Sequence, residues 1–136
     1  MNRKVKIIVI SSIISVVLIA IIISFLVLFK LNKVVSILTI DINPSISLSL
    51  NYKDEVIKIE GLNEDGKKLI ENNDLKEKSL EKTIENITTV VIENGYITKE
   101  DNFILISSDK NNLKNSVAKV IEKTSEKEII ECNIIT

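Results

Sequence analysis

The sequence predicts an α/β (α+β) protein in which a single N-terminal transmembrane helix precedes one small domain with helices packed on a mixed β-sheet. Residues 7–29 form a long apolar run without a charged side chain. Apolar and polar residues then alternate with period two, and two later segments repeat apolar residues with helical spacing. The chain has 136 residues, so roughly 100 remain after the apolar run, enough for one modest core.

The apolar run is long enough to cross a bilayer, which requires about 20 residues. A cleaved signal peptide is the alternative, but its apolar core is only about 7–15 residues long and ends in an A-x-A-like site. Three basic residues precede the run and two follow it, Lys30 and Lys33, which favours a cytoplasmic N-terminus. We therefore predict a single-pass protein of the cell membrane. Residues 1–6 form a cytoplasmic tail, residues 7–29 the transmembrane helix and residues 34–136 an extracytoplasmic domain.

The composition excludes several classes of function. There is no histidine, so imidazole catalysis and histidine-based metal sites are excluded. All 19 acidic residues lie after residue 33, so the predicted domain is net negative and unsuited to nucleic acid. We see no metal-ligand constellation and no cofactor fingerprint, and we expect no turnover enzyme. Cys132 alternates with Ile130 and Ile134, which predicts that the thiol is a small buried group.

The first half of the predicted domain reads as strands. Residues 38–51 alternate without a slip, apart from Pro44, as in a half-buried strand, and we expect residues 34–50 to form a strand interrupted by Pro44. Residues 51–55 are a polar turn and residues 56–60 a second alternating run, so residues 46–60 are expected to form a β-hairpin.

The second half adds helices and two further strands. A short helix is expected over residues 66–72. A longer helix over residues 80–94 begins after the capping residue Ser79 and stops at Gly95. A central strand, apolar on both faces, is expected at residues 103–106. A helix capped by Asn111 or Asn112 is expected at residues 112–124, and a last strand at residues 129–135.

The pair Asn43-Pro44 leaves two interpretations open. In the first, Pro44, the only proline, merely bends the strand. In the second, the Asn43 side-chain nitrogen attacks the backbone carbonyl of its own residue and expels the Pro44 nitrogen, which cuts the chain. Ordinary deamidation, in which the backbone nitrogen of the next residue attacks the asparagine side chain, is not possible because the proline nitrogen carries no proton. Asp41 lies on the same polar face and would take a proton from the amide or position it.

Three segments in order carry a resemblance to a known family: "TIDINPSISLSLN", "VIKIEGLNEDGKKLI" and "LKEKSLEKTIENI". Over roughly residues 34–125 the chain resembles the extracytoplasmic middle domain of the RsgI-type anti-sigma-I factors of Gram-positive bacteria. The resemblance implies self-cleavage between Asn43 and Pro44, with both pieces staying associated. It also implies that separation of the pieces leads to intramembrane proteolysis and release of a sigma factor.

The chain departs from the family pattern because only six residues precede the apolar run, where the family has its anti-sigma domain. We therefore expect no direct binding of a sigma factor. The expected partners are the membrane and either an intramembrane protease or a full-length anti-sigma factor. The alternative function is a non-cleaving, membrane-tethered binding or scaffold domain.

Overall fold

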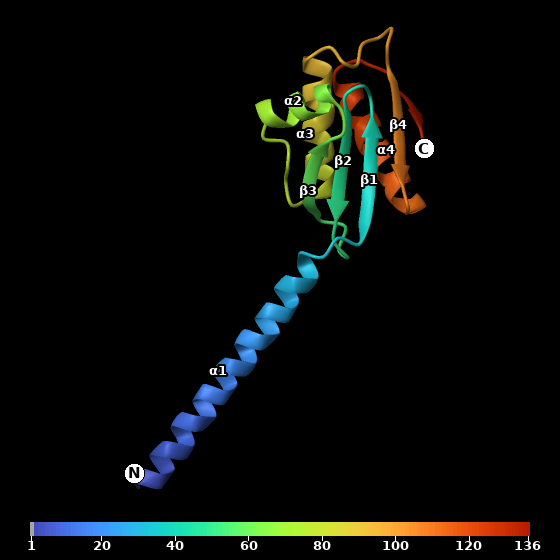
Figure 1. Cartoon of the computed structure of the whole chain (residues 1–136). Helices are drawn as coiled ribbons and strands as arrows, with labels where there is room; N and C mark the ends of the chain where they lie inside the picture. The colour runs from blue at the N-terminus through green and yellow to red at the C-terminus, as the bar shows by residue number, and fades with distance from the viewer. Residues whose placement is uncertain (1) are drawn as a thin grey trace. The chain divides into compact units, whose positions relative to one another are not determined.

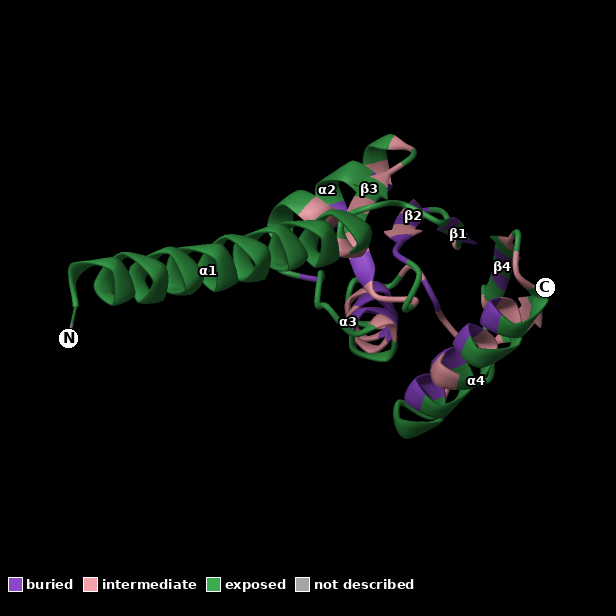
Figure 2. Ribbon diagram, turned by 90° about the horizontal axis from the view of Figure 1, so that it is seen from below, coloured by how far each residue is buried: buried purple, intermediate pink, exposed green. Residues whose placement is uncertain are grey.

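A computed structural model describes residues 2–136, which form two compact units, one ending at Lys33 and one running from Val34 to Thr136. The first unit is the helix α1 (Arg3–Leu31), whose side chains are exposed along almost its whole length (Figure 2). At a rise of 1.5 Å per residue its 29 residues extend about 44 Å, so α1 could cross a membrane by length and composition. The helix begins inside the predicted tail 1–6, of which Met1 lies outside the described residues.

The second unit is built on a five-stranded mixed sheet in the order β3-β2-β1-β4-β5 (Figure 1). All neighbours pair antiparallel except β4 and β5, which are parallel. The central strand is therefore the first in the chain, flanked by β2 and β4. The strands are β1 (Ser36–Asp41), β2 (Ser45–Leu50), β3 (Val56–Gly61), β4 (Phe103–Ser108) and β5 (Asn133–Ile135).

Three helices pack on this sheet in the predicted order: α2 (Glu64–Asn72), α3 (Leu80–Glu93) and α4 (Asn111–Lys127). The Ser79 side chain accepts a hydrogen bond from the Lys82 N–H, and Gly95 has φ 75, so both predicted signals of α3 are confirmed. The predicted cap of α4 is wrong. Lys110 is the N-cap residue and makes no side-chain cap, while Asn111 and Asn112 lie inside the helix.

The core lies between one face of the sheet and the helices, and α4 shows its buried stripe in Figure 2. On β4 only Ile104 and Ile106 are buried, whereas Phe103 and Leu105 are 63% and 45% exposed. The prediction of a strand buried on both faces is therefore wrong, because the helices cover a single face. Ile37, 52% exposed on β1, lies on the same open face.

Residues 34–50, predicted as a strand interrupted at Pro44, form two strands, and the reversal of the chain between them was not predicted. The chain reverses at residues 42–44, and β1 pairs antiparallel with β2, with Ile40 opposite Ile46 and Asp41 opposite Ser45. A loop of three residues keeps even-numbered residues on the same face of both strands. The period-two pattern therefore continues through the reversal without a slip. The predicted hairpin with its turn at residues 51–55 is confirmed as β2 and β3.

The last strand is shorter than predicted, since β5 covers only Asn133–Ile135. Ile129 has φ 58 and directs the chain away from α4 before the strand begins. Ile130, Cys132 and Ile134 pack against the core but are only partly buried, so the predicted burial of the Cys132 thiol is confirmed in part.

Candidate functional site

The candidate site is the loop of residues 42–44 between β1 and β2. Asp41, Asn43 and Pro44, the three residues predicted from the sequence, meet there. Pro44 is buried, whereas Asn43 is exposed at the tip. The Ile42 N–H donates to the Pro44 carbonyl oxygen at 3.0 Å and closes the loop. Pro44 lies outside the ladder, so its missing N–H costs the sheet no hydrogen bond.

Asn43 adopts an unusual backbone conformation, with φ 59. Asparagine tolerates the left-handed region better than most residues, but a residue before proline is normally extended with negative φ. Such a conformation stores about 1–3 kcal/mol and persists only when its surroundings hold it. The strain therefore lies on the residue whose carbonyl carbon is bonded to the Pro44 nitrogen.

Asp41 holds the loop from the end of β1. Its Oδ1 accepts a hydrogen bond of 2.7 Å from the Ser45 hydroxyl and one of 3.3 Å from the Asn43 backbone N–H. The carboxylate thus joins both ends of the loop to its tip. These contacts reach the backbone of Asn43 and fit a positioning role.

Asn63 belongs to the site and was missed by sequence reasoning. Its Oδ1 accepts from the backbone N–H of Ser45 at 3.1 Å and of Gly66 at 2.8 Å. Its Nδ2 donates to the Asn43 Oδ1 at 3.3 Å, across 20 residues of sequence. An asparagine before Glu-Asp-Gly indicates a helix N-cap, which Asn63 is, but the local pattern holds no sign of the contact with Asn43.

Two glycines let the start of α2 approach this loop. A Cβ on Gly66 would lie 2.3 Å from the Ser45 carbonyl oxygen, and a Cβ on Gly61 would lie 2.2 Å from the Lys67 nitrogen. The Leu62 N–H donates to the same Ser45 oxygen at 2.8 Å. Backbone packing without side chains therefore places Asn63 next to the loop.

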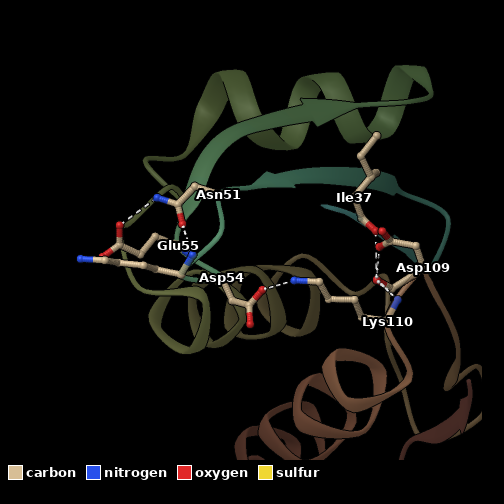
Figure 3. Close-up of polar contacts among 8 residues, drawn as sticks. Ile37, Asn51, Asp54, Glu55, Asp109 and Lys110 are labelled. Atoms are coloured by element: carbon tan, nitrogen blue, oxygen red, sulfur yellow. Dashed lines mark hydrogen bonds and ion pairs between the residues drawn. The ribbon is translucent and has the colours of Figure 1, made fainter. Parts of the chain in front are cut away.

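A separate polar network occupies the β2–β3 turn and the loop before α4 (Figure 3). The Asn51 side chain accepts from the Glu55 N–H and donates to the Glu55 carboxylate at 2.9 Å. This bond, assisted by Lys78, lowers the pKa of the Glu55 carboxyl. Asp54 and Lys110 form an ion pair of 2.9 Å. The network closes the turn and ties it to α4.

No group of three or more acidic, cysteine or histidine side chains within residues 2–136 is arranged to hold a metal ion. The polar side chains at the loop are the amides of Asn43 and Asn63, the carboxylate of Asp41 and the hydroxyl of Ser45.

Comparison with known proteins gives consistent matches. Residues 35–136 match the model of the anti-sigma factor RsgI-like central domain. The chain is 35% identical over 96 residues to the anti-sigma-I factor RsgI of Bacillus subtilis, which covers 70% of the chain and 25% of that protein. It is 40% identical over 70 residues to the anti-sigma-I factor RsgI6 of Acetivibrio thermocellus, covering 51% of the chain and 9% of the relative. The chain thus spans a quarter or less of these two relatives.

The close approach at Gly66 generates a test of the packing. Gly66→Ala places a methyl group against the Ser45 carbonyl and should lower the free energy of unfolding by about 1–3 kcal/mol. Chemical unfolding of the full chain in detergent micelles measures this loss. Lys68→Ala, at an exposed position of the same helix, is the control and should stay within about 0.5 kcal/mol of the wild type. Equal stability of the two variants would contradict the close approach.

Proposed function

The chain belongs to the family of anti-sigma factor RsgI-like central domains, and from that premise we propose that it is a membrane-anchored, extracytoplasmic signalling domain that cuts itself between Asn43 and Pro44. One observation carries the proposal. Asn43 stands exposed at the tip of a three-residue loop with φ 59, directly before a buried proline. The nucleophile and the bond to be cut are thus in one strained residue.

The reaction needs only atoms of the loop. The Asn43 Nδ2 attacks the backbone carbonyl carbon of the same residue, and a C–N bond forms as the bond to the Pro44 nitrogen breaks. One proton passes from Nδ2 to the proline nitrogen, which leaves as a secondary amine. The anchor fragment then ends in a cyclic succinimide, which water opens. Among residues 2–136, no protein group forms a hydrogen bond with Nδ2 of Asn43, so none holds the nucleophile away from the carbonyl carbon.

The leaving group is held in place while the tip is strained. Pro44 is buried, and its carbonyl oxygen accepts a hydrogen bond from the Ile42 N–H. Asn43, in contrast, is exposed. Asp41 fixes the Asn43 backbone nitrogen. The loop thus holds the attacking amide and the leaving group close together, and such positioning removes entropy loss from the barrier of the reaction.

The fragments would stay together after the cut. Fragment 1–43 keeps α1 and β1, and β1 lies between β2 and β4 at the centre of the sheet. Leu38 and Ile40 are 0% and 1% exposed, so two hydrogen-bonded ladders and the core hold the strand. Separation of the fragments requires that β1 leave the sheet. A signal that separates the fragments must therefore also disrupt the sheet.

Separation would leave the anchor as a target for an intramembrane protease, or allow contact with a full-length anti-sigma factor. Both belong to the proposal, as does the membrane itself, whereas no sigma-factor contact is assigned to residues 34–136. A non-cleaving scaffold domain is the second candidate. The exposed apolar face around Ile37, Phe103 and Leu105 favours it, because such faces bind partners.

Self-cleavage is tested on the full chain purified in detergent micelles. Denaturing electrophoresis and intact mass should show two fragments, residues 1–43 and 44–136, without added protease or metal. Asn43→Ala removes the nucleophile and should leave the chain whole. Pro44→Ala restores a backbone N–H and relaxes the loop, so the cut should slow by about tenfold or more. A folded wild-type chain that stays whole for days would contradict the proposal and favour the scaffold function.

Two substitutions distinguish a positioning role of Asp41 from a proton-transfer role. Asp41→Ala removes the acceptor for Asn43 and Ser45, and the cut should slow. Asp41→Asn keeps an acceptor oxygen but has no basic carboxylate, and the rate should stay within about threefold of the wild type. Time courses of cleavage measure both rates. Equal loss in the two variants would assign a proton-transfer role to the carboxylate instead.

The length and composition of α1 and its basic leading flank support the proposed topology, with the N-terminus in the cytoplasm and residues 34–136 outside. Protease added to intact protoplasts should digest a tag after residue 136 and spare a tag before residue 1. Lysed protoplasts, in which both tags become accessible, are the control. A protected C-terminal tag would contradict an extracytoplasmic domain.

A further inference from the structure

We infer that Asn63 is a positioning residue for the cut: it determines which end of the Asn43 side-chain amide faces the backbone. The inference rests on the self-cleavage proposed above. It concerns a side chain on a different element, at the start of α2, and it follows from the direction of three hydrogen bonds.

The orientation of the Asn63 amide is fixed by its two backbone partners. The N–H groups of Ser45 and Gly66 are donors only, so the Asn63 atom that lies 3.1 Å and 2.8 Å from them must be its oxygen. The Asn63 nitrogen then points to Asn43. Because this nitrogen is a donor, the Asn43 atom 3.3 Å away must be the oxygen Oδ1.

The consequence for Asn43 is that its nitrogen lies on the opposite side of the amide. In the reverse orientation Nδ2 would point at Asn63 and would be unavailable for attack. The donated bond has a second effect. Negative charge gathers on Oδ1 as Nδ2 gives up its proton, and a fixed donor at that oxygen stabilises this charge.

Asn63 is itself held rigidly. It is the N-cap residue of α2, and the absence of a side chain at Gly66 allows the helix start to approach Ser45. The Asn63 oxygen therefore caps the helix and holds the backbone after Pro44, and the nitrogen of the same amide sets the direction of the nucleophile. A side chain fixed by two hydrogen bonds from the backbone is suited to orient a reacting group.

Asn63→Asp separates these roles. The carboxylate still accepts from Gly66 and Ser45, so the cap and the fold should be retained. It cannot donate to the Asn43 oxygen, and it should draw Nδ2 toward itself. We expect cleavage about tenfold slower or more at pH 7, at an unchanged unfolding midpoint. The rate is measured by pulse-labelled cell-free synthesis of the full chain into lipid nanodiscs.

The pH profile supplies a readout that a purely structural role would not change. Below its pKa, about 4 for an ordinary aspartate, the introduced carboxyl carries a hydrogen that can bond Asn43 Oδ1. The rate of Asn63→Asp relative to the wild type should therefore rise as the pH falls from about 6 to about 3.5. The other ionisable side chains around Asn63 are Asp41, Glu64, Asp65 and Lys67, and all four are common to every variant.

Asn63→Ser is the matched control, because a serine caps a helix well but is too short to reach Asn43. It should cut slowly, with no recovery at low pH relative to the wild type. Recovery in Asn63→Asp alone would support the positioning role. Wild-type rates in Asn63→Asp at pH 7 would overturn it while self-cleavage stands. So would a slow rate without recovery, which would leave Asn63 a role in the fold only. An uncut, folded wild type would overturn both proposals.

Discussion

The pairing of Asp41 with Ser45 is the constraint on which the site depends. It limits the loop between β1 and β2 to three residues. Within so short a loop the tip residue takes up the reversal, and Asn43 does so with φ 59. The next residue turns back into the sheet, which buries the Pro44 ring. A longer loop would release Asn43 from the left-handed conformation and separate it from Asn63. The register of two strands thus sets the geometry of one peptide bond.

The position of β1 connects this bond to the rest of the molecule. In the chain the strand begins shortly after α1 and ends at the loop, so β1 is the element that links α1 to the candidate bond along the chain. That strand is central, with ladders on both sides and its even-numbered residues in the core. An edge strand could leave with the loss of one ladder of hydrogen bonds. Removal of β1 breaks two ladders and opens the sheet between β2 and β4. The proposed cut after Asn43 would leave these contacts of β1 in place.

Local chemistry was predictable from the sequence, and contacts across the fold were not. Ser79 and Gly95 marked the ends of α3 because caps act within one helical turn. The reversal at residues 42–44 was hidden, since an odd loop leaves the alternation intact. The strand at 103–106 looked central because four apolar residues do not reveal that helices cover a single face. Asp41, Asn43 and Pro44 could be grouped as neighbours in the chain. Asn63 could not, because its contact with Asn43 exists only once α2 has packed on the hairpin.

The central claim is that the chain cuts itself through the Asn43 side chain, and the chemistry of the new end tests it most directly. High-resolution mass spectrometry of the anchor fragment, taken at the earliest times after synthesis, identifies the group at residue 43. We expect a succinimide, one water lighter than asparagine, which then opens to a mixture of C-terminal asparagine and the α-amide of aspartate. A fragment that ends from the start in asparagine alone would show that water or a protease made the cut, and would contradict the claim.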